Sequence, residues 1–185
     1  FAYNPTAGTV VADGDHWRIS PQAHYLVGPF GLVGEYAISQ QAVLNSTTLK
    51  RADLAHSAWN LTAQWVLTGE AASLTGIDPA HPFRLQGDGW GAWQFVARYG
   101  QLDIDKDAFL GYSNPKVSAN GATAWSVGLN WWLNRNLRLL TSFSHTTFSG
   151  GGSPLNFADP ATLVNPGLVT QQSENALFTR IQLSF

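Results

Sequence analysis

The stretch ENALFTRIQLSF, residues 174–185, predicts the fold of the chain, because its side chains alternate in character residue by residue. Successive side chains of an extended strand point to opposite faces. The largely apolar face carries Leu177, Thr179, Ile181, Leu183 and Phe185. The other face is mostly polar and has Arg180 near its middle. Such a strand fits a soluble sheet, and it equally fits a strand with lipid on one side and water on the other.

The composition excludes several classes of protein. Only 12% of the 185 residues are charged, against about 25% in ordinary soluble domains. The mean hydropathy is nevertheless −0.08, and no run of about 20 predominantly apolar residues is present to form a membrane-spanning helix. The net charge of −2 argues against a nucleic-acid partner, and the lack of Cys excludes disulfides. The chain starts with Phe and has no Met, so we expect a mature or truncated chain whose targeting segment lies outside it.

The same alternation recurs along the chain. After an expected loop at residues 1–14, it predicts seven strands, at residues 16–27, 32–41, 56–67, 91–100, 122–133, 137–148 and 175–185. Pro21 has no backbone N–H group, so we expect a bulge or irregularity in the first of these strands. Strands of about ten residues are long enough to cross a membrane when tilted.

The predicted connections alternate in length. Residues 28–31 and 134–136 are short turns. The long connections are residues 42–54, 101–120 and 149–173. Outer-membrane barrels have short periplasmic turns and long extracellular loops, so the short turns are expected on the periplasmic side. Residues 68–89 are an exception, because this connection is long and yet falls at the periplasmic end.

Large aromatic side chains recur six residues apart on the apolar faces of three predicted strands. The pairs are Trp59 and Trp65, Trp93 and Tyr99, and Trp125 and Trp131. Six residues span roughly 20 Å along a strand. Aromatic rings at both ends of an apolar stripe are typical of the girdles of a membrane barrel. A soluble β-sandwich with an aromatic core is the competing interpretation, but the opposite stripe is too consistently polar for it.

We therefore predict an all-β protein that forms an antiparallel transmembrane β-barrel. Seven strands would leave two sheet edges unpaired in lipid, and single-chain bacterial barrels have an even number of strands. We expect residues 1–185 to be the C-terminal part of a larger barrel. Completion of the barrel by other chains is the alternative.

Five charged side chains fall within the predicted strands, all on the polar face. They are Arg18, Glu35, Arg98, Arg138 and Arg180, and we predict that they line the pore. Four of the five are positive, and arginine in a pore wall favours the passage of anions such as phosphate. The alternative is that these arginines pair with acids from infolded loops.

No catalytic, metal or cofactor site is predicted. Asp103, Asp105 and Asp107 resemble the start of a calcium loop, but Ala108 and Asn114 stand where such a loop needs Gly and a bidentate Glu. We therefore expect a solvated surface loop there. Ser144 and His145 are adjacent and face opposite sides of a strand. The leading interpretation is a passive channel, and the alternative is a non-porin outer-membrane barrel with a structural, adhesive or enzymatic role.

Several stretches resemble the C-terminal part of the phosphate-selective porin O and P family. They are residues 28–31 leading into Glu35 and Tyr36, WVLTGE at 65–70, GAWQFVARY at 91–99, VGLNWWLN at 127–134, and the closing residues 176–185. The resemblance spans most of residues 15–185.

The resemblance implies a sixteen-stranded, homotrimeric porin that conducts phosphate or polyphosphate across the bacterial outer membrane. Arg98 and Arg180 would be wall positions, and the family's basic constriction loop would lie in the half of the barrel outside this chain. The implied partners are the lipid bilayer, lipopolysaccharide, phosphate-like anions and the outer-membrane assembly machinery, which would read Phe185 at the end of the last strand.

Overall fold

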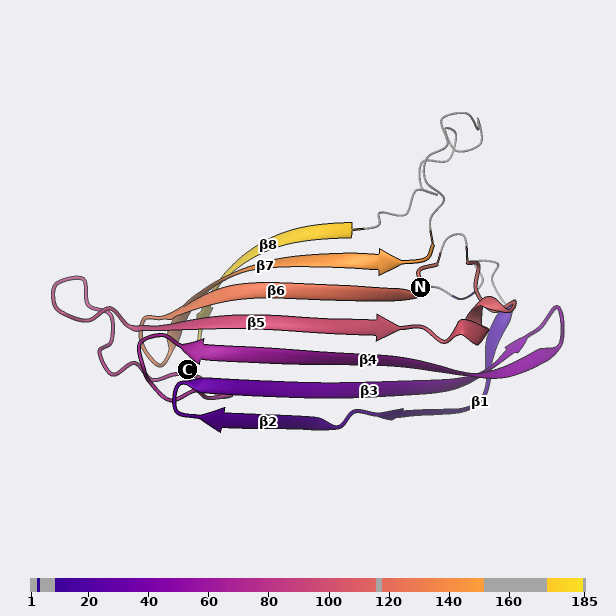
Figure 1. The fold of residues 1–185 in the computed structure, drawn as a ribbon, viewed down its shortest axis with the longest axis horizontal. Helices are drawn as coiled ribbons and strands as arrows, with labels where there is room; N and C mark the ends of the chain where they lie inside the picture. Colours follow the sequence, from indigo (N-terminus) through magenta and orange to yellow (C-terminus); the bar gives the residue numbers. More distant parts are fainter. Residues whose placement is uncertain (1–2, 4–8, 116–117, 152–172, 185) are drawn as a thin grey trace, which may run out of the picture.

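The computed structural model describes residue 3 and residues 9–115, 118–151 and 173–184. This part of the chain forms eight strands and one short 3-10 helix (Figure 1). Their bounds are β1 (Val10–Ile19), β2 (Gln22–Val27), β3 (Phe30–Asn45), β4 (Lys50–Val66), β5 (Ala92–Asp103), η1 (Lys106–Phe109), β6 (Gly121–Trp132), β7 (Leu137–Ser149) and β8 (Ser173–Leu183).

The strands form one antiparallel sheet in the order β1-β3-β4-β5-β6-β7-β8. β2 also pairs with β3, so β1 and β2 lie end to end along the same edge of that strand (Figure 1). The prediction of an all-β, antiparallel fold is confirmed. Closure into a sixteen-stranded barrel stays a prediction.

The first predicted strand, residues 16–27, is wrong as a single element. β1 ends at Ile19 and β2 begins at Gln22, because Pro21 cannot donate to the ladder. The Pro21 carbonyl still accepts a hydrogen bond from the Tyr36 N–H at 3.1 Å. The loop predicted at 1–14 is also wrong from Val10 onward, since β1 starts there and pairs with the extended end of β3.

The loop predicted at 42–54 is wrong as well. β3 continues to Asn45 and β4 starts at Lys50, so the turn occupies only residues 46–49. The strands have 16 and 17 residues, more than the roughly 9–11 that cross a bilayer. Val43 and Leu54 are buried in this extension. The polar residues of this stretch predicted a loop, but in the structure most of them belong to the two strands of a hairpin.

The remaining predicted strands, 91–100, 122–133, 137–148 and 175–185, are offset at their ends by up to three residues from the bounds in the structure. Element boundaries read from sequence are commonly offset by this much. The predicted strand 32–41 starts at Phe30, because the turn before it is only Gly28 and Pro29. Gly28 has a φ of 51°, a conformation that favours glycine.

Asn45 holds the tip of the β3–β4 hairpin, so we expect Asn45→Ala to loosen it. Its Oδ1 accepts from the N–H groups of Thr47 and Thr48 at 3.0 Å each, and its Nδ2 donates to the Gly111 carbonyl at 2.7 Å. Losing these bonds at a buried site should cost about 1–3 kcal/mol. Hydrogen exchange at residues 46–49 and 110–113 should speed up. Unchanged exchange at both segments would contradict this role.

The apolar face of the sheet carries large side chains that the described residues leave partly exposed. Trp65, Tyr99 and Trp125 are 46%, 44% and 42% exposed. Ring contacts form two rows across the strands. One row, toward the short turns, contains the stacked pairs Phe30–Trp65 and Trp93–Trp131, and the other contains Trp59–Tyr99 and Trp125–Phe143. An exposed apolar band between two aromatic rows is the pattern of a lipid-facing barrel wall.

Candidate functional site

The opposite, polar face of the sheet carries all five charged residues predicted to line a pore. The strand registers establish this, because directly paired residues share a face. Glu35 on β3 pairs with Asn60 on β4. Thr62 is two residues from Asn60 and so lies on the same face, and it pairs with Arg98 on β5. Arg98 continues to Ser126 and Ser144. Arg18 pairs directly with Ser39, Arg138 with Gln182, and Arg180 with Leu140. Each of these pairs also lies on the polar face.

Glu35, the single acid of the five, is held by neutral donors. Its Oε1 accepts from the Ser20 hydroxyl at 2.7 Å and from the Gln22 amide at 3.1 Å, and its Oε2 accepts from the Asn60 amide at 3.1 Å. Arg98 is an electrostatic neighbour of this carboxylate, but no ion pair within 4.0 Å joins the two. Glu35 therefore does not neutralise any arginine through direct contact.

The described residues also place no carboxylate within 4.0 Å of the arginines on this face. Among the described residues the ion pair within 4.0 Å is Arg51–Asp13, at 2.7 Å, and Arg51 belongs to the β3–β4 hairpin. The Arg18 Nε donates instead to the Ser39 hydroxyl and to the His16 ring, at 3.2 Å each. The described part of the chain thus contains no ion pair between a wall arginine and a loop acid, which was the alternative interpretation.

Arg138 and Arg180 meet at one neutral oxygen. Arg138 donates from Nε and Nη2 to the Gln182 Oε1 at 3.1 and 2.7 Å, and Arg180 donates to the same oxygen. The Arg138 guanidinium also lies over the Trp132 ring, 4.8 Å from its centroid, which is within the range of a cation–π contact. This corner of the sheet therefore concentrates positive charge, and no carboxylate of the described residues lies within 4.0 Å of either arginine.

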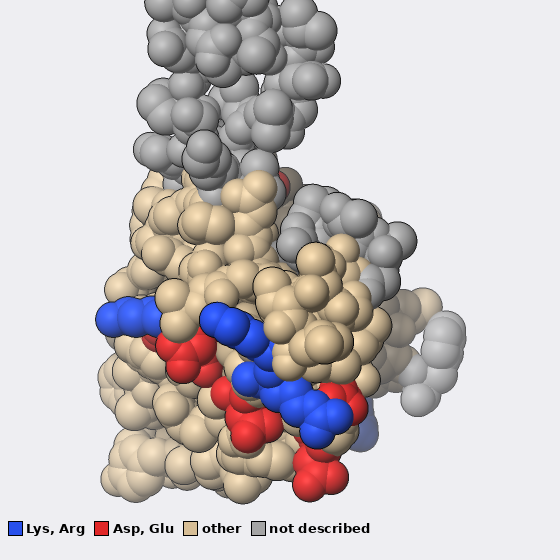
Figure 2. Space-filling model, turned by 90° about the vertical axis from the view of Figure 1, so that its right-hand side faces the viewer, with Lys and Arg blue, Asp and Glu red and all other residues tan. Residues whose placement is uncertain are grey.

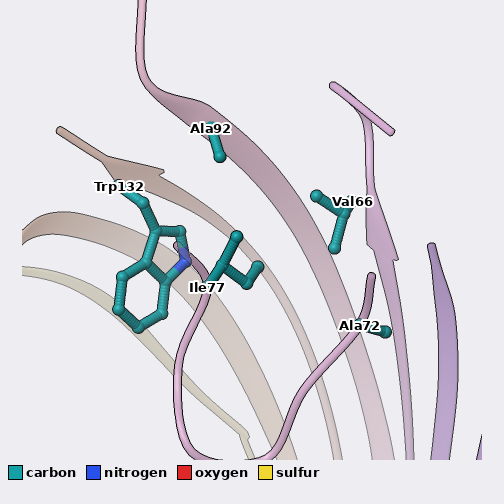
Figure 3. Close-up of a cluster of buried hydrophobic side chains, with 5 residues drawn as sticks. All are labelled: Val66, Ala72, Ile77, Ala92 and Trp132. Carbon is teal, nitrogen blue, oxygen red and sulfur yellow. The ribbon is translucent and has the colours of Figure 1, made fainter. Parts of the chain in front are cut away.

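The connection between β4 and β5, residues 67–91, folds back onto the polar face beside this corner. We call it the inward segment. Ala72 and Ile77 of this segment pack against Val66, Ala92 and Trp132 of the strands, all 8% exposed or less (Figure 3). The long connection that broke the predicted alternation of turns and loops is thus a packed element at the short-turn end of the sheet.

A cavity of about 480 Å³ lies between the inward segment and the sheet. Residues 73–76 form one wall, and Arg135, Arg138 and Gln182 contribute to another. Gln64, Gln94 and Asn130 also line it, and they form a chain of hydrogen bonds with Trp132. The Gln94 Oε1 accepts from the Asn130 amide at 2.8 Å and from the Trp132 indole at 3.2 Å.

A second apolar cluster lies at the opposite end of the polar face, beside the β3–β4 hairpin. Ala108 and Tyr112 pack there against Val43 and Leu54 of the long hairpin. Tyr3 contacts this cluster, and burial raises the pKa of its phenol. Viewed from this end, basic and acidic side chains lie next to one another (Figure 2), in contrast to the arginine-rich polar face.

Asp103, Asp105 and Asp107, which resemble part of a calcium loop, are engaged in contacts within the protein. The two carboxylate oxygens of Asp105 accept from the N–H groups of Ala55 at 2.8 Å and Asp107 at 3.0 Å, and Asp103 accepts from the Gln101 amide at 2.9 Å. Among the described residues, no group of three or more His, Cys, Asp or Glu side chains is placed to hold a metal ion.

Ser144 and His145 point to opposite faces, as the sequence predicts. Ser144 pairs with Ser126 on the polar face, whereas the His145 ring lies 5.8 Å from Trp125 and its Nδ1 contacts the Asn175 Oδ1 at 2.7 Å. They therefore cannot act as a hydrogen-bonded nucleophile and base.

The described residues contain no helix that is both long enough and apolar enough to cross a membrane. Residues 4–182 match the sequence model of the phosphate-selective porin O and P family. The chain belongs to this family. Membership indicates a bacterial outer-membrane channel that contacts the lipid bilayer, rather than an enzyme. No curated protein matches the chain.

Sequence reasoning missed several residues of this porin's polar face. Trp132, Gln182 and the inward segment were not among the predicted site residues. An aromatic residue on an otherwise polar stripe, only six positions before Arg138, is the signal that could have pointed to Trp132. Nothing in the sequence pattern indicates that residues 72–77 return to the same corner.

Proposed function

We propose that this porin is a passive channel for small anions, with phosphate or polyphosphate as its substrates, and that Arg18, Glu35, Arg98, Arg138 and Arg180 line its pore. The observation that carries the proposal is the absence of a carboxylate within 4.0 Å of any of these four arginines in the described part of the chain. Uncompensated guanidinium groups attract anions and match the geometry of phosphate oxygens.

The assembly we propose is a homotrimer in the outer membrane, in contact with lipopolysaccharide. Family membership supports it, together with the exposed apolar face between the two aromatic rows. Recognition of Phe185 by the outer-membrane assembly machinery is part of the same proposal, although Phe185 lies outside the described residues.

Replacing two wall arginines tests the proposal. In full-length protein reconstituted in planar bilayers, Arg98→Ala combined with Arg180→Ala should lower the anion-to-cation permeability ratio severalfold, because two of the four arginines that this chain contributes to the wall are lost. The reversal potential across a salt gradient measures this ratio.

The matched control is Arg51→Ala. This residue is charged in the same way, but it lies in the long hairpin and pairs with Asp13, so the permeability ratio should stay close to the wild-type value. An unchanged ratio in the double variant would refute the assignment of these arginines to the pore wall.

A further inference from the structure

The Arg138 corner has unused capacity to bind an anion. A guanidinium group has five N–H donors, and Arg138 directs Nε and one N–H of Nη2 at the single neutral oxygen of Gln182. Arg180 donates to the same oxygen. Two cations that share one uncharged acceptor repel each other, and an anion at this point relieves that repulsion.

The cavity beside Arg138 has the size and lining of a small-molecule site. Its volume of about 480 Å³ falls within the roughly 300–1,000 Å³ of typical ligand pockets. Arg135 and Arg138 contribute its positive charge, and no acidic side chain is among its lining residues. Ser73 and Thr75 of the inward segment add hydroxyl groups on the opposite wall.

The amide chain along this cavity is incompletely satisfied. Asn130 is 6% exposed, and its Oδ1 has no hydrogen-bond partner among the described residues; neither does the buried Nε2 of Gln64. One atom is an acceptor and the other a donor. Both atoms are buried beneath the cavity surface, so a ligand in the cavity meets the Arg138 guanidinium and the Ser73 and Thr75 hydroxyl groups rather than these two atoms.

We propose that the cavity between residues 73–76 and the polar face binds a phosphate-like oxyanion, with Arg138 as its principal contact and Arg135 at its rim. The inference rests on the proposed function only for the route by which the anion arrives. The cavity lies on the face opposite the exposed apolar band, so free phosphate, and not the phosphate of a lipid headgroup, is its ligand. The inward segment thereby gives the pore a binding site independent of any constriction loop.

Binding of inorganic phosphate to the full-length, detergent-solubilised protein tests the proposal. Isothermal titration calorimetry should show saturable binding that Arg138→Gln weakens about tenfold or more, as expected for the loss of a charge-assisted contact. Arg84→Gln is the matched control, because Arg84 belongs to the inward segment but does not line the cavity. It should bind like the wild type.

The outcomes separate this site from the proposed function. Anion selectivity in bilayers together with phosphate binding that Arg138→Gln leaves unchanged would overturn the site and leave the channel standing. Phosphate binding that is lost in Arg138→Gln, in a protein that conducts no ions, would support the site and refute the channel. Equal weakening by Arg84→Gln would show a general charge effect and overturn the site.

Discussion

Val127→Arg is expected to destabilise this porin strongly in a bilayer, by about 2–4 kcal/mol. Val127 lies on the apolar face between Ala97 and Phe143, and along β6 it falls between Trp125 and Trp131, which belong to the two aromatic rows. An arginine on the lipid face at the bilayer midplane costs about 2–4 kcal/mol, because its charge loses water and gains no partner. Denaturant unfolding of the full-length protein in lipid vesicles, followed by tryptophan fluorescence, measures this loss.

Ser142→Arg is the control for that prediction. Ser142 lies at nearly the same height but on the polar face, opposite Gly128, whose missing side chain leaves room for a longer one. The added arginine should therefore remain solvated and change the free energy of unfolding little. If Ser142→Arg destabilises the protein as much as Val127→Arg, the two faces are assigned the wrong way round.

The assignment of faces is the part of the fold that the sequence predicts well. Alternation in the stretches around Trp59, Trp93 and Trp125 places the apolar and polar residues on opposite sides, and the strand registers agree at every pair of these strands. Alternation works here because each strand borders two media along its whole length, so a shift of one residue would expose every polar side chain to lipid.

Sequence reasoning fails where a segment packs against a distant part of the same chain instead of facing lipid or water. The hairpin at residues 42–54 is extended because Val43 and Leu54 pack against Ala108 and Tyr112, a contact between positions more than fifty residues apart. The inward segment is held in the same way, by Ile77 against Trp132. Periodicity predicts the face of a side chain, but it carries no information about which distant segment covers that face.

Ile77→Asp is expected to release the inward segment from the polar face and to widen the pore. Ile77 is 3% exposed in the cluster with Val66, Ala92 and Trp132 (Figure 3). Burying an isoleucine contributes about 1.5–3 kcal/mol, and an unpaired carboxylate at the same place costs several kcal/mol more. Detachment of the segment is cheaper than burial of that charge.

The segment should detach only between its two backbone tethers. The Ala72 N–H donates to the Gly28 carbonyl and the Phe83 N–H to the Leu133 carbonyl, each at 2.7 Å. These bonds lie on either side of Ile77 and do not depend on its side chain. The sheet itself should therefore remain folded, and the loosened residues should lie between positions 73 and 82.

Single-channel recording and limited proteolysis measure this release. Ile77→Asp should raise the conductance severalfold and add current noise, and protease should cut between residues 73 and 82, where the wild type resists. Leu85→Asp adds the same charge to the same segment at a side chain that is 93% exposed, so it should conduct and resist protease like the wild type. Wild-type conductance and protease resistance in Ile77→Asp would mean that the inward segment does not obstruct the pore, because a charge in its apolar anchor cannot leave that anchor in place.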